Sequence, residues 1–166
     1  MANANLRRTS MCVGLMLALL AALATACSHH HRRQETLNER EYATYRGAGT
    51  AMISGQVTHT LSNGQVLYGS ACQVRLTPIT SESSRYMSDV VMSGGTKPWK
   101  ADADAIWWLE QADDSGRFRF KEVPAGSYYL TCPVAWREPG GGTRERILWA
   151  EATVAAGDSV DVAVSR

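Results

Sequence analysis

The stretch from Gly116 to Trp136 constrains the fold more than any other part of this sequence. It reads GRFRFKEVPAGSYYLTCPVAW, with apolar side chains at alternate positions on both sides of a Pro-Ala-Gly turn. Side chains two residues apart on a strand point to the same face, so this period predicts two half-buried strands joined by a turn. The positions expected to face a core are Phe118, Phe120, Val123, Tyr128, Leu130, Cys132, Val134 and Trp136.

The rest of the chain from residue 51 onward continues in the same way. Residues 51–60 alternate and are followed by Ser62-Asn63-Gly64, and Asn-Gly between alternating runs is a strong signal for a hairpin. Further short strands are expected at 65–68, 70–79, 146–154 and 159–164, and also at 105–112, where a helical turn is the alternative. Seven or eight short strands with Gly-rich turns, and no βαβ alternation, predict an all-β fold, an antiparallel Greek-key sandwich.

Residues 1–26 are expected to be a signal peptide that is removed. Arg7 and Arg8 precede an apolar run over 11–26, which is shorter than the ~20 residues of a membrane-spanning helix and has the length of a secretory leader. The run ends in LATAC, which resembles the lipobox of bacterial lipoproteins and implies cleavage before Cys27 and lipid attachment to it. Ordinary cleavage at the same place, with Cys27 left as a free thiol, is the alternative.

The residue after Cys27 is Ser28 and not Asp. By resemblance to the sorting rules of bacterial lipoproteins, this favours lipid anchoring in the outer membrane, facing the periplasm or the cell surface. Residues 27–50 are polar, show no apolar period and are expected to be a lipidated tether that does not pack, with a short helix possible around 35–45. The domain would then occupy 51–166, with an insertion at 80–104 that is rich in Ser, Gly and charge and is expected to be a long loop.

The net charge of the protein argues against one class of partner. The whole chain has 17 basic and 16 acidic residues, and cleavage of the leader would remove Arg7 and Arg8. The net charge of the mature protein is therefore expected to be close to zero. With no basic cluster in the domain, nucleic acid is not expected as a partner.

The segment GRFRFKEVPAGSYYLTC is similar to the central signature of carboxypeptidase regulatory-like domains, which are transthyretin-like (prealbumin-like) sandwiches. The matching positions are Gly116, Phe118, Phe120, Val123, Pro124, Gly126, Tyr128 and Leu130. The opening strand at 53–57, the strand at 71–76 and the closing pattern at 157–164 fit as well, so the resemblance covers about 51–166. It implies the fold, and it implies no chemistry, because the motif only fills the space between sheets and forms a turn.

The cysteines of the domain fit this resemblance. Cys12 leaves with the leader and Cys27 would carry lipid, so Cys72 and Cys132 remain as an even pair in an oxidising compartment. Both lie on inward faces of strands that the resemblance makes neighbours in one sheet, which implies a Cys72–Cys132 disulfide. Two buried free thiols are the alternative.

No catalytic or metal-binding constellation is found in the sequence. His59 is the one histidine of the expected domain, and neither a GxSxG nor an HExxH pattern accompanies it, so an exposed strand position is expected. The histidines at 29–31 would point in different directions on an extended chain and make a poor closed metal site. Four aspartates fail the spacing of an EF-hand loop: Asp102, Asp104, Asp113 and Asp114. We therefore expect no enzyme, no metal and no cofactor.

The candidate binding surface consists of aromatic residues. Trp107 and Trp108 are adjacent, so on a strand one of them must point outward unless something covers it. With Tyr86 and Trp99 in the neighbouring insertion, they could stack on sugars or anchor a partner; alternatively, the insertion folds over them.

Two functions are compatible with these features. The leading interpretation is a non-enzymatic envelope lipoprotein whose sandwich is an interaction or scaffold module for another envelope protein. The alternative is a carbohydrate-binding module that uses its exposed tryptophans.

Overall fold

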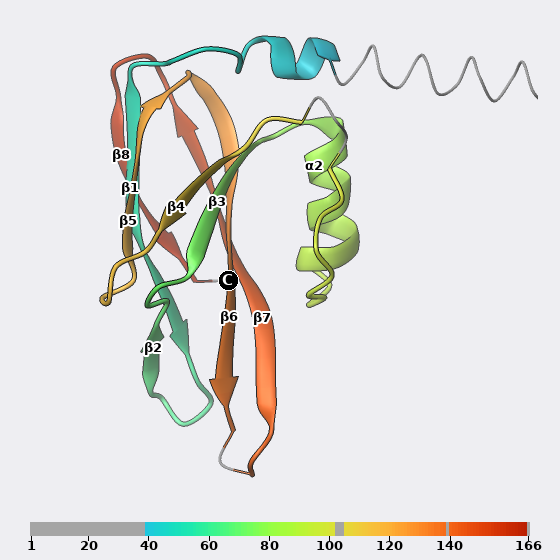
Figure 1. Cartoon of the computed structure of the whole chain (residues 1–166), viewed down its shortest axis with the longest axis vertical. Helices are drawn as coiled ribbons and strands as arrows, with labels where there is room; N and C mark the ends of the chain where they lie inside the picture. Colours follow the sequence, from blue (N-terminus) through green and yellow to red (C-terminus); the bar gives the residue numbers. More distant parts are fainter. Residues whose placement is uncertain (1–38, 102–104, 139, 166) are drawn as a thin grey trace, which may run out of the picture. The chain divides into compact units, whose positions relative to one another are not determined.

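Residues 39–101, 105–138 and 140–165 are described by the computed structural model of this chain. Eight strands form two facing sheets, as the sequence predicts for an all-β sandwich (Figure 1). The strands are β1 (Ala51–Thr60), β2 (Val66–Tyr68), β3 (Gln73–Pro78), β4 (Trp108–Gln111), β5 (Arg117–Val123), β6 (Gly126–Arg137), β7 (Thr143–Val154) and β8 (Ser159–Val164). Among the described residues, no helix is both long and apolar enough to cross a bilayer.

The first sheet is built around β1. Strand β5 pairs with it in antiparallel fashion and β2 pairs with its last three residues, while β8 pairs with residues 52–57. The β1–β8 pairing is parallel, which corrects the expectation of purely antiparallel pairing. Parallel neighbouring strands need a long connection. Here the connection from β1 to β8 consists of strands β2 to β7 and the segments that join them.

The second sheet has the order β4-β3-β6-β7 and is antiparallel throughout. Strands β6 and β7 pair in unbroken register from Gly126↔Val154 to Arg137↔Thr143. Their distal ends form a hairpin that extends past the end of β3 (Figure 1).

The core lies between the two sheets and contains the predicted inward stripe from Phe118 to Val134, whereas Trp136 lies outside it against His59. Its fully buried large side chains include Ile53, Leu76, Phe120, Tyr128, Leu130 and Leu148. Gly55 on β1 is required for this packing, because a Cβ there would lie 2.7 Å from Cζ of Phe118 and 2.0 Å from the carbonyl oxygen of Val162. The uneven spacing of Phe118, Phe120 and Val123 is explained by a bulge, since Ala51 pairs with Val123 but Ile53 pairs with Phe120.

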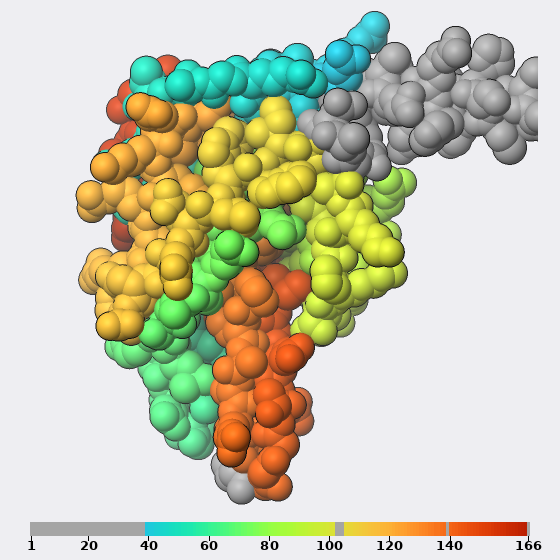
Figure 2. Space-filling model, in the orientation of Figure 1, coloured from blue at the N-terminus to red at the C-terminus, as the bar shows by residue number. Residues whose placement is uncertain are grey.

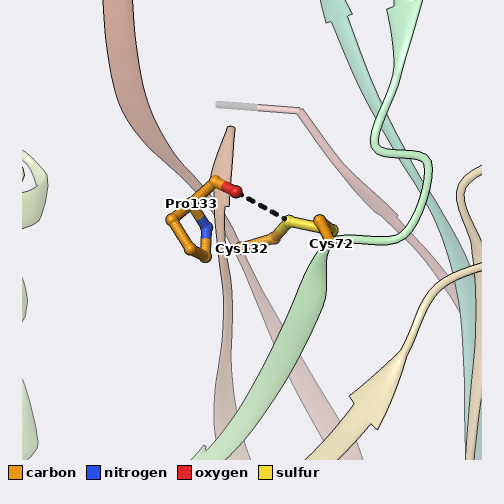
Figure 3. Close-up of a disulfide and its surroundings, with 3 residues drawn as sticks. All are labelled: Cys72, Cys132 and Pro133. Atoms are coloured by element: carbon orange, nitrogen blue, oxygen red, sulfur yellow. Dashed lines mark hydrogen bonds between the residues drawn. A yellow bond between two sulfur atoms is a disulfide. The ribbon is translucent and has the colours of Figure 1, made fainter. Parts of the chain in front are cut away.

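The predicted disulfide is present. Cys72 immediately precedes β3 and bonds to Cys132 on the adjacent β6, with the two Cα atoms 6.3 Å apart (Figure 3). Cys132 is fully buried, and the carbonyl oxygen of Pro133 lies 3.6 Å from its sulfur. The bond therefore joins neighbouring strands at the edge of the core.

The insertion at 80–104 corrects the expectation of a long loop. It begins with helix α2 (Ser81–Tyr86) and continues into a turn of π-helix, η1 (Met87–Val91). Thr80 caps α2 in a reciprocal pair with Ser83. The two helical segments lie over the outer face of the second sheet, where the buried Met87 and Val91 of η1 pack against side chains of β6 and β7 (Figure 1).

The segment before β1 also differs from the expected tether. Residues 39–43 are helical, and Tyr42 is fully buried. The hydroxyl of Tyr42 donates to Oε2 of Glu82 at 3.2 Å, and the Glu41 carboxylate accepts from the backbone N–H and hydroxyl of Ser81. The compact unit therefore includes residues 40–50, and the N-terminal part of the expected tether lies outside the described residues.

Candidate functional site

Three of the four predicted surface aromatics lie together outside the second sheet. Tyr86 ends α2, Trp99 lies on the segment that returns along the helix, and Trp107 directly precedes β4. The Tyr86 and Trp99 rings stack with centroids 5.8 Å apart, and the Trp99 and Trp107 rings meet edge to face at 6.0 Å. We call these three residues the aromatic cluster. Trp107 is 41% exposed, so the insertion does not cover it.

Arg75 joins the aromatic cluster from the sheet below. It alternates with the buried Val74 and Leu76 on β3, so its side chain leaves the core and points to the outer face. Its guanidinium carbon lies 6.0 Å from the Trp99 ring centroid and 5.9 Å from that of Trp107, which is within the range of cation–π attraction. Burial raises the pKa of the Tyr86 hydroxyl, and the positive charge of Arg75 opposes that shift.

A groove of about 160 Å³ lies beside the aromatic cluster. Its floor is the outer face of the sheet, and its wall is the segment after η1; Figure 2 shows this segment in yellow-green and yellow next to the orange strands. The lining residues are Gln73, Arg75, Tyr86, Thr96, Pro98, Trp99, Leu109, Thr131, Pro133 and Ile147. Amide, hydroxyl and guanidinium groups next to apolar rings suit a polar ligand with apolar faces.

The Tyr86 hydroxyl holds the wall of the groove in place. It donates to the carbonyl oxygen of Lys97 at 3.0 Å, which ties the returning segment to the end of α2. A second groove of about 250 Å³ shares Tyr86, Pro98 and Trp99 with the first, and its other lining residues are Glu82, Arg85, Asp89, Val90, Lys97 and Lys100. The first groove therefore has one charged lining residue and the second has several.

Trp108 does not belong to the aromatic cluster, which corrects its place in the candidate surface. It packs against the core, and its ring meets that of the buried Tyr128 edge to face at 5.9 Å. The physical reason is the alternation of a strand: Trp108 begins β4 and points inward, so its neighbour Trp107 points outward.

Reasoning from the sequence missed Arg75 and the groove floor. The alternation of β3 placed the Arg75 side chain on the outer face, but no pattern indicated that two indole rings from a distant segment would flank it. Thr131 and Ile147 come from β6 and β7, and the sequence analysis predicts no helical cover over the outer faces of these strands.

The other residues considered for chemistry lie elsewhere. His59 is half-buried, which corrects its expected exposed position, and its ring centroid lies 4.7 Å from that of Trp136. This contact links the β1–β2 hairpin to the β6–β7 hairpin and lies outside the main core. Burial, followed by the charge of Arg146, lowers the pKa of His59. Within the described ranges, no group of three His, Cys, Asp or Glu side chains could hold a metal ion. Cys27 lies outside those ranges.

Comparison with known proteins supports the fold. A candidate carbohydrate-binding protein from Pseudomonas aeruginosa has a TM-score of 0.67 and 24% identity, over 77% of this chain and 96% of that one. No family model matches the sequence, and no curated protein matches it. The resemblance to carboxypeptidase regulatory-like domains therefore stays a prediction, while the sandwich itself is confirmed.

Two further solved structures are more distant. The major pilin subunit of Bacillus cereus has a TM-score of 0.42 at 12% identity, over 70% of this chain and 30% of that one. A DUF3823 family protein from Parabacteroides merdae has a TM-score of 0.37 at 18% identity, over 72% and 46%. At these scores neither neighbour bears on the function.

Proposed function

We propose that this chain is a non-enzymatic, lipid-anchored protein of the bacterial envelope whose sandwich domain, of the carboxypeptidase regulatory-like kind, binds glycans. The observation that carries the binding function is the aromatic cluster at the edge of the groove. A sugar ring presents C–H groups on its faces and hydroxyls around its rim, so one face stacks on an indole while the hydroxyls meet polar side chains.

The groove and the aromatic cluster beside it together offer both kinds of contact. The Trp107 ring is accessible, while Trp99 is held between Tyr86 and Trp107 and cannot turn away without breaking two ring contacts. Gln73, Thr96 and Thr131 supply amide and hydroxyl groups along the floor and wall. A rigid aromatic surface limits the conformational entropy that is lost on binding.

The solved structure with a TM-score of 0.67 agrees with this proposal, because it is described as a candidate carbohydrate-binding protein. At 24% identity the likeness shows the fold alone, so the binding function rests on the groove and its aromatic residues.

The proposal is tested with the full chain purified from membranes in detergent. Tryptophan fluorescence is followed during titration with neutral and acidic oligosaccharides from cell walls and capsules. We expect saturable changes for at least one sugar, which Trp107→Ala weakens at least tenfold. The matched control is Trp149→Phe, which keeps an aromatic ring next to the helix but away from the groove lining. If no sugar changes the fluorescence of the native protein, the glycan-binding role is wrong.

A second candidate function is a protein-interaction module, and one observation favours it. Val66 and Tyr68 on the short edge strand β2 are 45% and 54% exposed, and strand edges with exposed apolar residues are sites where a partner strand can add. Cross-linking in the native envelope tests it: a specific protein adduct that Tyr68→Ser abolishes supports this function, and recovery of no adduct argues against it.

A further inference from the structure

The charge of Arg75 bears on which class of sugar the groove would bind. It is the one charged residue among those that line the 160 Å³ groove, whose other lining groups are apolar, amide or hydroxyl groups. No hydrogen bond or ion pair is observed for its guanidinium within the described part of the chain. Two indole rings hold the group at the groove without using its N–H donors.

A guanidinium held in this way is suited to one kind of ligand group. Its planar fork of N–H donors matches the two oxygens of a carboxylate, and such charge-assisted pairs are stronger than neutral hydrogen bonds. Contact with the Trp99 and Trp107 rings restricts the Arg75 side chain, so less of its conformational freedom remains to be lost when a ligand binds. A neutral sugar offers the guanidinium hydroxyl oxygens as acceptors but no opposite charge.

The neighbouring charges agree with an anionic ligand. Lys97 and Lys100 lie on the segment that forms the wall, one on each side of Trp99 in the sequence, and both line the second groove. Glu145 and Glu151 are exposed on the same face of β7 as Ile147, but they do not line this groove. The two carboxylates of the helical cover are Glu82, which is buried and accepts from Tyr42, and Asp89, which lines the second groove. Neither of them lines the groove that holds Arg75.

We propose that the groove selects sugars that bear a carboxylate, such as hexuronic acids, with the sugar ring on an indole of the aromatic cluster and the carboxylate on the Arg75 guanidinium. This inference rests on the proposed glycan-binding function and narrows its ligand class. It makes Arg75 the residue that determines specificity and leaves the aromatic rings as the source of general sugar affinity.

The test compares acidic sugars with their own methyl esters. Oligogalacturonate, oligomannuronate and oligoglucuronate are titrated into the full chain in detergent, each alongside its fully methyl-esterified form, which keeps the ring and loses the charge. We expect at least one oligouronate to bind roughly tenfold or more tightly than its ester. Arg75→Gln should reduce the affinity for the acid to that for the ester, and Arg75→Lys, which keeps a charge without the planar fork, should fall between them.

The matched control is Arg119→Gln, which removes the same charge from the exposed outer face of β5 in the other sheet. It should leave both affinities unchanged, and equal losses in the Arg75 and Arg119 variants would show general charge attraction and overturn the inference. Equal binding of acid and ester overturns it as well, while the glycan-binding function stands. Binding of neither acids, esters nor neutral sugars defeats the proposed function itself. A normal unfolding midpoint for Arg75→Gln shows that the variant is folded.

Discussion

At the residue scale, Trp107 and Trp108 are neighbours in sequence with opposite surroundings. Trp107 is exposed at the aromatic cluster, whereas Trp108 packs against the core. Their side chains therefore contribute to different properties of the protein, and the strand alternation that separates them allows a matched pair of variants.

We predict opposite effects for the two alanine variants. Trp108→Ala should lower the free energy of unfolding by about 2–4 kcal/mol, because it leaves a cavity against Tyr128. Trp107→Ala should lower it by less than about 1 kcal/mol, because it removes surface contacts only, yet it should weaken sugar binding. Urea unfolding of the two variants checks the stabilities. Similar losses of stability in both variants would contradict the assigned orientations.

The disulfide is the second residue-scale feature with a measurable consequence. Cys72 and Cys132 are 60 residues apart in the sequence. Closing a loop of that length restricts the unfolded chain, and the chain-entropy description gives about 4 kcal/mol. We predict that the double variant Cys72→Ala/Cys132→Ala loses stability of that order in urea unfolding. The native protein in a reducing agent should behave like the variant, and an unchanged midpoint in both cases would contradict the prediction.

At the element scale, the turn between β4 and β5 is organised by one carboxylate. Oδ1 of Asp113 accepts from the backbone N–H of Ser115 at 2.9 Å, from its hydroxyl at 2.7 Å and from the N–H of Arg117 at 2.9 Å. The hydrogen bond from the Arg117 backbone, followed by that from the Ser115 side chain, lowers the pKa of Asp113 below its ordinary value of 3.8.

This lowered pKa predicts a pH dependence of stability. The ionised form is favoured in the folded state, so its contribution is present above pH 3.8 and is lost as the pH falls through the lower pKa of the folded protein. We expect Asp113→Asn to lower the unfolding temperature at pH 7, with the difference from the native protein narrowing as the pH falls below 3.8. Asp114→Asn is the matched control, and a pH-independent difference for Asp113→Asn would contradict the assignment.

The strands and the helix differ in how far the sequence predicts them. Alternation around Phe118 and Phe120 predicts the strands, because a core between two sheets imposes a period of two. Helix α2 is only six residues long, too short to show a helical period or to be stable alone. Its stability comes from contacts with residues about 40 positions earlier, including Glu41, which no local pattern reveals.

In the candidate site too, some features follow from local sequence patterns and others depend on contacts between distant segments. Strand alternation predicts that one of Trp107 and Trp108 points outward, and the structure selects Trp107. The place of Arg75 between two indole rings follows from the helical cover over the sheet and could not be read from the order of residues. The consecutive apolar residues Tyr128, Tyr129 and Leu130 on β6, and Ile147 and Leu148 on β7, are local signals of a cover on both faces, and all of them are buried.

The contact between the segment before β1 and α2 gives a further element-scale prediction. The Tyr42 hydroxyl accepts from Oγ1 of Thr80 at 3.3 Å and donates to Glu82, all in buried surroundings. Tyr42→Phe should therefore lower the free energy of unfolding by about 1–2 kcal/mol. Tyr68→Phe, on a side chain that is 54% exposed, is the matched control and should change little. Urea unfolding measures both, and equal effects would contradict a specific role for Tyr42.

At the scale of the whole molecule, the chain connects a proposed membrane anchor to a proposed binding surface. The folded unit begins at Arg40, and its first turns contact the helix that carries Tyr86 of the aromatic cluster. The stretch between Cys27 and Arg40 would link that unit to lipid. Anchoring and sugar binding are thus assigned to separate parts of the sequence, so a change in one should leave the other intact.

Replacement of Cys27 tests this separation. If LATAC is a lipobox, Cys27→Ser removes the only attachment point for lipid, and the protein should move from the outer-membrane fraction to another fraction of the cell. The unfolding midpoint should stay the same, because the disulfide uses Cys72 and Cys132. Cys12→Ser is the matched control: it lies in the apolar run that cleavage removes, so the fractionation pattern should be that of the native protein. Ordinary signal-peptide cleavage gives a different result, in which the native protein is already outside the membrane fraction and intact-mass measurement finds no added lipid on Cys27.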